Sequence, residues 1–455
     1  MRSAQSGSGS GYKYYLLTVL TVILLFNYVD RVALGLLLQD IKTDLNLSDT
    51  QLGFLTGIAF ALFYSVMGIP IARWADRGNR VLIISLTAAL WSAMVALCGV
   101  ARSFTHLLLI RVGVAVGEAG CIPPAFSLIA DYFSRAERPR ATAIYQLGGA
   151  LSAVVGYLLA GWVSELYGWR TTFILLGLPG LMLAGLAWTT LREPRPALLP
   201  SVKPSATPEP SLPEVCRTLW SIATFRHLLI CISAQAFFNV GIGQWLPTFF
   251  IRSHGFTTGE IGTWFAVIYG ASGLVGAYLG GDMASRHAAH NERLQLIAIA
   301  IAITAAGVLL SLVYVVSNAH VAFALMALTS VGLNSSNGPL FATIQTLVPE
   351  RMRAVSLALV YLVSNLIGMG LGPLATGMLS DLFHPWAQAE SLRYALLVMS
   401  PGYFLFAWHV WRASRTVTHD LAATQHAASQ HTVTASEPAP ATMERRAGKR
   451  VGAGS

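Results

Sequence analysis

Four charged residues stand in stretches of sequence that are otherwise apolar. Asp30 and Arg31 are neighbours within residues 14–38. Arg111 and Glu118 are seven residues apart in a second apolar stretch. Each stretch is long enough to cross a bilayer, which takes roughly 20 apolar residues. Carboxylates and arginines in such a medium can exchange a proton or hold an anion, so these four side chains are the first candidates for chemistry.

Helix geometry predicts how the four charges can meet. Arg111 and Glu118 share one helix face, about 10 Å apart along the axis. Asp30 and Arg31 point about 100° apart, so they cannot simply satisfy each other. From the rise per residue, we expect Asp30 and Arg31 to lie between the levels of Arg111 and Glu118. All four would then form one layer.

The cost of burying charge indicates that this layer is paired or hydrated. One charge at the centre of a membrane helix costs roughly 2.5 to 3.5 kcal/mol, so four unpaired charges would cost about 10 to 14 kcal/mol. One alternative is a static ion-pair cluster that locks two helices together. The alternative that we favour is a switch. In it, Asp30 and Glu118 change protonation while Arg31 and Arg111 hold them or an anionic headgroup.

The composition indicates that membrane helices position these charges. Of 455 residues, 54% are hydrophobic and 11% are charged, against roughly 25% charged in a soluble domain. The hydrophobicity pattern predicts an all-α integral membrane protein with twelve transmembrane helices. The expected spans are 14–38, 50–72, 81–101, 106–130, 141–163, 169–191, 222–249, 258–281, 294–317, 319–346, 354–380 and 391–412.

The distribution of positive charge predicts the orientation. If the amino terminus is cytoplasmic, 23 Lys and Arg residues lie on the cytoplasmic side and 5 lie in the joints on the outer side. By the positive-inside rule both termini are then cytoplasmic, and we expect a multi-pass protein of a bacterial cytoplasmic membrane. This topology accounts for the net charge of +9, so we expect no nucleic-acid partner.

Composition also predicts the domain boundaries. Prolines concentrate in residues 192–221, which we interpret as a cytoplasmic linker. Residues 413–455 lack apolar periodicity and are expected to form a disordered cytoplasmic tail. The remaining parts are a cytoplasmic amino-terminal segment, 1–13, and two six-helix halves, 14–191 and 222–412.

The two halves have the pattern of an internal duplication. Residues 48–53 recur at 257–262, an offset of 209, and each copy begins with a capping box. Residues 137–141 recur at 350–354, an offset of 213. Bundles built from such parallel repeats bind substrate between the halves and rock one half against the other. The four charges have no charged counterpart in the second half, so their chemistry belongs to the first half alone.

The joint after the second helix carries a short charged motif, Asp76-Arg77-Gly78-Asn79-Arg80. It resembles the signature loop of the major facilitator superfamily, and it departs from that pattern at Ala72 and Asn79, where glycines are usual. The resemblance implies the fold of that superfamily. It also implies that this loop pairs charges across the cytoplasmic side of the bundle, with Asp76, Arg77 and Arg80 as a gate latch.

Three motifs together resemble the Spinster branch of that superfamily, over about residues 14–412. They are NYVDR in the first helix, ADRGNR after the second and RVGVAVGEAG in the fourth. Members of the branch are associated with moving sphingosine-1-phosphate or lysophospholipids, and bacterial relatives with proton coupling. The resemblance implies that Asp30, Arg31 and Glu118 form the functional polar cluster. Arg111 resembles the helix 4 arginine that is associated with proton coupling.

The repeat and the resemblance predict a proton-coupled secondary active transporter of a lysophospholipid-like or sphingoid amphiphile, working by alternating access. The alternative is a proton-coupled efflux pump of small drugs or organic anions. No nucleotide-binding motif occurs in the sequence, so a gradient would supply the energy. We expect no enzyme activity, cofactor or metal, and a monomer whose partners are the lipid bilayer, the substrate and protons. Candidates for lining the cavity are Asn27, Tyr64, Phe238, Asn239, Asn334 and Tyr361.

Overall fold

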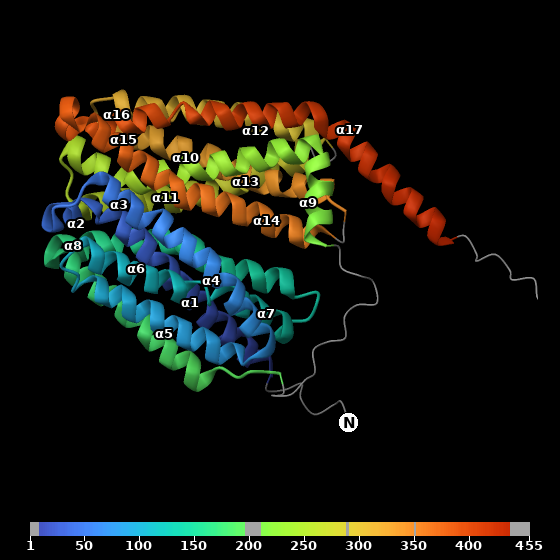
Figure 1. The fold of residues 1–455 in the computed structure, drawn as a ribbon, viewed down its shortest axis with the longest axis horizontal. Helices are drawn as coiled ribbons and strands as arrows, with labels where there is room; N and C mark the ends of the chain where they lie inside the picture. The colour runs from blue at the N-terminus through green and yellow to red at the C-terminus, as the bar shows by residue number, and fades with distance from the viewer. Residues whose placement is uncertain (1–8, 196–210, 288–290, 350–351, 437–455) are drawn as a thin grey trace, which may run out of the picture.

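The structure, a computed structural model, describes residues 9–195, 211–287, 291–349 and 352–436. Within these ranges the chain is helical and has no strand (Figure 1). Each predicted span falls on one to three of the helices, which confirms the all-α fold class. The helices are α1 (Gly9–Leu36), α2 (Leu38–Leu45), α3 (Asp49–Thr56), α4 (Ile58–Arg77), α5 (Arg80–Cys98), α6 (Phe104–Glu118), α7 (Ile122–Tyr132), α8 (Arg138–Thr190), α9 (Leu212–Ser221), α10 (Ala223–His254), α11 (Thr258–His287), α12 (Glu292–Val315), α13 (Ala319–Leu347), α14 (Arg353–Asn365), η2 (Leu366–Leu371), α15 (Gly372–Ala387), η3 (Gln388–Glu390), α16 (Ser391–Met399) and α17 (Gly402–Ser436).

Nine helical stretches in the described ranges are long and apolar enough to cross a membrane, and two of them are too long for one crossing. The α8 helix has 53 residues, about 80 Å of helix, against a hydrocarbon core of about 30 Å. It breaks at Gly168, whose φ of 80° lies in a region that glycine adopts readily. Residues 355–424 form a stretch of 70 residues that is interrupted around η3. Each of these two stretches holds two predicted spans.

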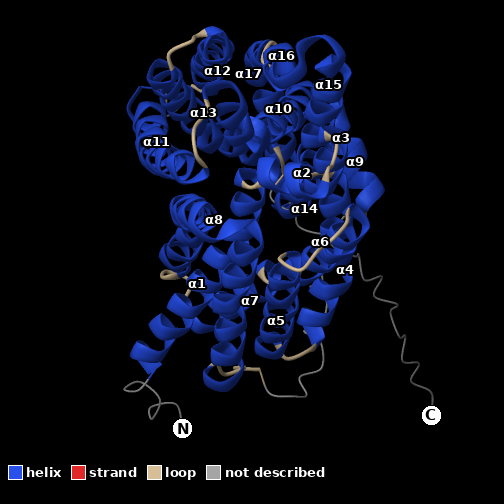
Figure 2. Cartoon of the chain, turned by 90° about the vertical axis from the view of Figure 1, so that its left-hand side faces the viewer, coloured by secondary structure: helices blue, strands red, loops and turns tan. Residues whose placement is uncertain are grey.

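The helices pack as two bundles. Helices α1 and α4–α8 form one bundle, and α10–α13 with α15–α17 form the other (Figure 2). The start of α1, the end of α17 and helix α9 lie at the same end of the molecule (Figure 1). We call this end the terminus side and the opposite end, where α2, α3 and α16 lie, the loop side.

Both predicted capping boxes are present. Ser48 Oγ accepts a hydrogen bond from the backbone N–H of Gln51 at 3.1 Å, and Gln51 Oε1 accepts one from Ser48 N at 2.9 Å. In the second bundle Glu260 Oε2 accepts from Thr257 N at 3.0 Å, and Thr257 Oγ1 accepts from Glu260 N at 3.3 Å. The repeated sequence therefore begins α3 and α11 with the same local structure.

Helix α9 forms inside the predicted linker. Ser211 caps its start by accepting a hydrogen bond from Glu214 N at 3.4 Å. Val215 and Leu219, four residues apart and therefore on one face, are buried. This short amphipathic pattern outweighs the neighbouring prolines, which were the basis of the linker prediction. The preceding part of the predicted linker, 196–210, lies outside the described residues.

Two further helices extend beyond the predicted limits of the halves. The α1 helix begins at Gly9, inside the predicted amino-terminal segment. The α17 helix continues to Ser436, into the predicted disordered tail, because Ala413 and Val417 are fully buried in the core and carry the helix past residue 412. Residues 437–455 of that tail lie outside the described part of the chain.

On the loop side, glycines let the two bundles approach at backbone distance. A Cβ atom built on Gly53 of α3 would lie 2.5 Å from the carbonyl oxygen of Pro373. A Cβ built on Gly161 of α8 would lie 2.9 Å from the Cα of Gly262 in α11. Neither contact leaves room for a side chain, so small residues determine how closely the bundles meet.

We predict that Gly53→Ala destabilises the closed loop side, lowering the melting temperature by several degrees and lengthening the distance between spin labels on α3 and α15. Gly68→Ala in α4 is the matched control, because nothing lies within 4 Å of a Cβ at that position. In the control, alanine should be neutral or stabilise by about 0.5 to 1 kcal/mol through helix propensity. Equal effects of both substitutions would contradict the packing role of Gly53.

Candidate functional site

The four buried charges form two ion pairs that cross between α1 and α6. Arg111 Nη1 donates to Asp30 Oδ2 at 2.8 Å, and Arg31 Nε donates to Glu118 Oε2 at 2.7 Å. Neighbours on α1 thus pair with residues seven apart on α6, as the helix geometry predicts. The result is one layer of two positive and two negative charges.

Glu118 is the last residue of α6. Gly120 follows, and a Cβ built on it would lie 2.3 Å from Thr87 Cγ2 of α5, so the chain passes close against α5. Pro123 and Pro124 then stand in the first turn of α7, where proline is tolerated. The chain is therefore interrupted directly after the acidic residue.

Burial differs between the two pairs. Asp30, Arg111 and Glu118 are 1%, 2% and 0% exposed, whereas the Arg31 side chain is 17% exposed. The ring of Phe60, in α4, stands near both guanidinium groups, with its centroid 4.7 Å from Arg31 Cζ and 5.1 Å from Arg111 Cζ. This ring supplies cation–π contact where water is excluded. Of the four charged residues, only Arg31 is held in an ion pair on one side and accessible on the other.

Several polar atoms in this layer have no hydrogen-bond partner among the described residues. They are Oδ1 of Asp30, Oε1 of Glu118, Nε of Arg111 and both amide atoms of Asn27. Each carboxylate therefore uses one oxygen in its ion pair and keeps the other unengaged. A buried oxygen of this kind can accept a proton without first breaking the ion pair.

The exposed side of Arg31 lines a cavity of about 250 Å³ between the two bundles. Asn239 and Gln244 of α10 contribute amide groups, and Tyr157 of α8 and Tyr269 of α11 contribute rings. The two tyrosine rings are stacked across the bundles, with centroids 5.7 Å apart. The cavity thus combines one cation, two amides and aromatic surface, a set that suits an anionic or polar group attached to an apolar body.

An ion-pair network closes the loop side above this cavity. Arg252 of α10 holds Asp49 of α3 with two hydrogen bonds of 2.8 Å, and Lys42 Nζ lies 2.6 Å from Asp49 Oδ1. Ser380 Oγ donates to Asp49 Oδ2 at 2.6 Å. Asp381 accepts the backbone N–H groups of Asp49 and the next residue at 3.0 and 2.7 Å, so a carboxylate from the second half of the chain caps a helix of the first half.

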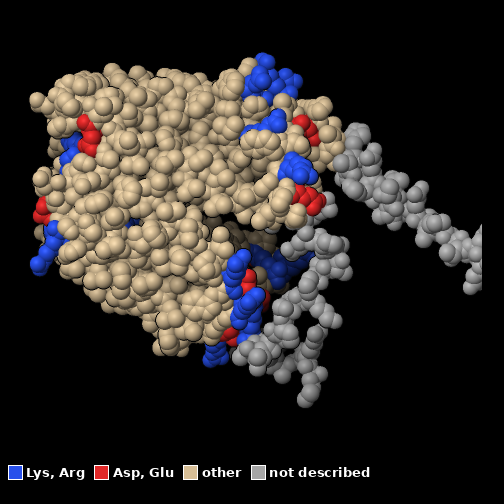
Figure 3. All heavy atoms as spheres, viewed as in Figure 1, with Lys and Arg blue, Asp and Glu red and all other residues tan. Residues whose placement is uncertain are grey.

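A second contact closes the loop side between α8 and α11. Trp162 Nε1 donates to Thr263 Oγ1 at 3.0 Å, and Glu165 Oε2 accepts the N–H of Gly259 at 2.7 Å. The surface is hollowed between the bundles on the terminus side (Figure 3). The hydrogen bonds that the structure describes between the bundles therefore gather at the end that is closed.

Comparison with known proteins identifies this architecture. The sequence matches the Major Facilitator Superfamily over residues 20–373. The chain belongs to this superfamily. It is also similar to an "MFS-type efflux pump" of Mycolicibacterium smegmatis, with 32% identity over 89% of this chain and 93% of the relative. "Protein spinster homolog 1" of Xenopus tropicalis is 26% identical over 88% of this chain and 84% of the relative.

A solved structure supports the same assignment. A crystal structure of a bacterial homolog of the human lysosomal transporter Spinster, inward-facing and unoccupied, has a TM-score of 0.80 and 31% sequence identity. The match covers 90% of this chain and 98% of that chain. The predicted resemblance to a bacterial Spinster-type member of the superfamily is confirmed. The chain is therefore a multi-pass membrane protein of a transporter superfamily, and its members act on small-molecule substrates.

The residues predicted to line the cavity lie in different places in this superfamily member. Asn239 is on the cavity wall, and the Tyr64 ring lies 5.0 Å from Arg31 Cζ. Asn27 is fully buried one turn before the charged pair of α1. Phe238 packs within the second bundle, edge-on to the neighbouring Phe237 at 5.0 Å. These residues come from α1, α4 and α10.

The last two lining candidates do not reach the layer of charges in any described contact. Asn334 donates to the backbone oxygen of Ser330 at 2.9 Å on its own helix, α13. Tyr361 is exposed and stacks on Phe341, with ring centroids 5.1 Å apart. A polar side chain at the depth of the charged layer can therefore form its hydrogen bond with the backbone of its own helix.

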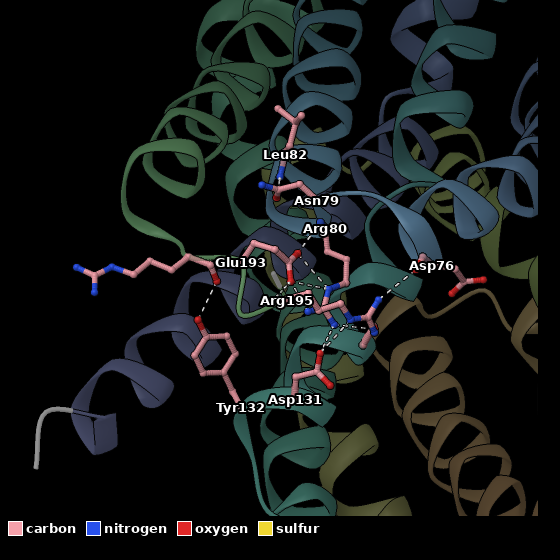
Figure 4. A network of polar contacts seen from close by, with 10 residues as sticks. Asp76, Asn79, Arg80, Leu82, Asp131, Tyr132, Glu193 and Arg195 are labelled. Carbon is pink, nitrogen blue, oxygen red and sulfur yellow. Dashed lines mark hydrogen bonds and ion pairs between the residues drawn. The ribbon is translucent and has the colours of Figure 1, made fainter. Parts of the chain in front are cut away.

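The predicted gate latch divides into two parts (Figure 4). Arg80 is fully buried, and its guanidinium group binds Asp131 Oδ2 at 2.6 Å and the Glu193 carboxylate, Nε to Oε2 at 3.1 Å. Asp76 and Arg77 are exposed, and their charged groups have no ion-pair partner in the described ranges. All of these residues belong to the first half of the chain, so the network ties helices of one bundle together.

Glu193 lies just beyond the membrane span, so its titration can be assigned a direction. Burial raises the pKa of this carboxyl, but hydrogen bonds from the Arg80 side chain, Arg195 N and Arg80 N outweigh burial and hold the pKa below its ordinary value. Glu193 therefore stays ionised at neutral pH. Arg195 also donates to the backbone oxygen of Asp76 at 3.4 Å, while the Asp76 carboxylate points away (Figure 4).

Sequence reasoning did not assign roles to Asp49 or Arg252, and it did not place Phe60 beside the two arginines. Phe60 could have been found from its spacing, because it stands four residues before Tyr64 on one face of α4 and the two rings stack 5.7 Å apart. Asp49 follows a helix cap, a position that acidic residues often occupy for local reasons. Its partner Arg252 is 203 residues away, so only the fold brings the two together.

We predict a strong energetic coupling between Asp30 and Arg111. Asp30→Asn or Arg111→Gln alone should destabilise the protein by about 3 to 5 kcal/mol, because each leaves a buried charge without its partner. The double variant should lose much less than the two single losses combined. A double-mutant cycle of chemical unfolding in detergent measures this coupling.

The exposed Asp44–Arg170 pair is the matched control for that cycle, since its side chains are 44% and 38% exposed. Its coupling should be about 0 to 1 kcal/mol. Additive effects of Asp30→Asn and Arg111→Gln would show that the buried pair is not energetically coupled.

Proposed function

We propose that this protein is a proton-coupled transporter that moves a lipid-like amphiphile by alternating access. The observation that carries the proposal is the position of Arg31, which is paired with Glu118 on one side and lines the cavity on the other. An anionic headgroup in the cavity would compete with Glu118 for the same guanidinium group. Substrate binding and carboxylate charge are then linked through one side chain.

Proton coupling follows from what happens to Glu118 when Arg31 turns to a substrate. A fully buried carboxylate that loses its cation is stabilised by binding a proton. Glu118 Oε1 makes no hydrogen bond among the described residues, which supports a protonation site at that atom. Asp30 and Arg111 form the second, drier pair of the same layer and would respond when α1 and α6 move.

The chemistry of the cavity favours an amphiphile. Arg31, Asn239 and Gln244 can bind a phosphate or another polar headgroup, while Tyr157 and Tyr269 offer apolar surface beside them. The 31% identity to a bacterial Spinster homolog adds support from the comparison. In the ordinary case this superfamily works as a monomer, and we propose the same here.

The distribution of charge supports an inward-facing state. With 23 Lys and Arg residues assigned to the side of the termini and 5 to the other side, the terminus side would be cytoplasmic in a bacterial inner membrane. The loop side, closed by Asp49 and Arg252, would then face outward. Opening that side requires the Asp49–Arg252 ion pair and the glycine contacts to separate. Asp76 and Arg77 would pair across the cytoplasmic side in the opposite state.

An efflux pump of small drugs or organic anions is the second candidate. The relative of Mycolicibacterium smegmatis named an MFS-type efflux pump favours it, at 32% identity over 89% of this chain. The same Arg31 site would bind a small anion. The two candidates differ in whether the ligand needs an acyl chain.

We predict that Asp30→Asn and Glu118→Gln each abolish proton-driven accumulation or efflux in proteoliposomes. Substrate counterflow, which needs no net proton movement, should be retained at least in part. Asp44→Asn, which removes an exposed carboxylate on the loop side, is the control and should transport like the wild type. Unchanged proton-driven flux in both site variants would refute the coupling role of this layer.

We also predict that lysophospholipids or sphingoid bases raise the melting temperature of the purified protein, and that the shift depends on pH. The screen compares lysolipids, sphingoid bases and small organic anions at two pH values. Arg31→Gln should remove the response to anionic lysolipids. Responses confined to small hydrophilic anions would exclude the lipid substrate and favour the efflux candidate.

A further inference from the structure

A groove runs along the outer surface of the second bundle, between α12 and α17, away from the transport site. Its apolar part has a volume of about 690 Å³ and is lined chiefly by Ile297, Ile301 and Thr304 of α12 and by Phe404, Trp408 and Trp411 of α17. A second hollow of about 490 Å³ continues along the same two helices towards the terminus side. Arg293 and Thr418 line this second hollow. The α12–α17 groove is thus apolar along most of its length and polar at one end.

Arginines gather at the polar end of the groove. Arg293 precedes Ile297 by one turn on α12, and Arg415 follows Trp411 by one turn on α17, so both fall on the faces that line the groove. Arg415 Cζ lies 3.8 Å from the centroid of Trp411. Arg412 Cζ lies 5.7 Å from the centroid of Trp408. Basic side chains are visible at this end of the surface in Figure 3.

These arginines differ from the buried Arg80 of the terminus side in that no acidic partner is described for them. Arg80 is bound by Asp131 and Glu193, whereas no ion pair is described for Arg293, Arg412 or Arg415. The two carboxylates near the groove form no described ion pair with these arginines. Asp420 accepts the N–H of Thr224, and Glu292 stands beside Arg293 without an ion pair in the described part of the chain. With three arginines against two carboxylates, the groove end carries a net positive charge that an outside anion can balance.

The dimensions match one leaflet of a membrane. From Phe404 to Arg415 is eleven residues, about 16 Å of helix. Half of a hydrocarbon core is about 15 Å. An acyl chain lying on Phe404, Trp408 and Ile301 would therefore bring its headgroup to the level of the arginines. Basic sites between helices on the cytoplasmic side are suited to anionic headgroups.

We propose that the α12–α17 groove is a binding site for an anionic phospholipid of the leaflet on the terminus side, with one acyl chain along the apolar part and the headgroup between Arg293 and Arg415. The assignment to the cytoplasmic leaflet rests on the proposed orientation. The binding itself is independent of transport, because the groove shares no residue with the cavity of Arg31. This lipid would bridge α12 and α17 and is distinct from a transported substrate.

The test uses the full-length protein, stripped of lipid in a neutral detergent, and native mass spectrometry with thermal shift as readouts. The probes are palmitoyl-oleoyl phosphatidylglycerol, the matching phosphatidylcholine, and glycerophosphoglycerol as the headgroup alone. We expect one phosphatidylglycerol to be retained in preference to phosphatidylcholine. Arg293→Gln/Arg415→Gln should weaken its binding about 25-fold, at about fivefold for each arginine near the headgroup.

Further variants separate the two parts of the groove. Arg293→Lys/Arg415→Lys keeps the charge and should restore most of the binding. Thr304→Trp fills the apolar part without changing charge and should also weaken binding. Arg135→Gln/Arg140→Gln removes two exposed arginines of the same side in the other bundle and should leave binding unchanged.

Four results would overturn the proposal. They are equal retention of phosphatidylcholine, an equal loss in the Arg135→Gln/Arg140→Gln control, full stabilisation by glycerophosphoglycerol alone, and a protein dimer that Thr304→Trp dissociates. The last would mean that a second copy of the chain covers the groove. Failure of the transport predictions would leave these binding measurements unaffected, so the two proposals can fail separately.

Discussion

Four charges in a medium that cannot solvate them have to neutralise one another, and this requirement ties α1 to α6 through two side-chain ion pairs. Asp30 and Arg31 are adjacent and point in different directions, so neither can serve the other. Arg111 and Glu118 share one face of α6. Arg111 pairs with Asp30, and Glu118 pairs with Arg31. Because insertion of unpaired charges would cost as much as the whole stability of a typical domain, the crossed pairing fixes the relative height and rotation of the two helices.

The two ion pairs are not equivalent, because only one of them can be reached from the cavity. Asp30 and Arg111 are sealed from the cavity, while Arg31 is accessible from it. The ring of Phe60 stands against both arginines, so moving one guanidinium group changes the surroundings of the other. A static ion-pair cluster that only locks two helices together would work equally well if both pairs were sealed from the cavity. The accessible arginine is the feature that makes a switch the better interpretation.

Different interactions are found at the two ends of the molecule. On the loop side, backbone contacts at Gly53 and Gly161 are combined with the Asp49–Arg252 ion pair, so closure needs both shape and charge. On the terminus side, Arg80 is satisfied entirely within the first half of the chain by Asp131 and Glu193. At this end the polar network of the first bundle therefore does not depend on the other bundle.

The sequence by itself determined the helical architecture, the duplication and the four charges, because apolar spans, capping boxes and buried ionisable residues leave local patterns. It could not determine that Asp49 meets Arg252 or that Asn239, and not Asn334, faces the cavity, since these depend on rotation and contact between distant helices. Helix α9 and the extension of α17 show the same limit. Residues such as Val215 and Val417 make a helix only because tertiary packing buries one of its faces, and a proline-rich or polar composition does not reveal that burial.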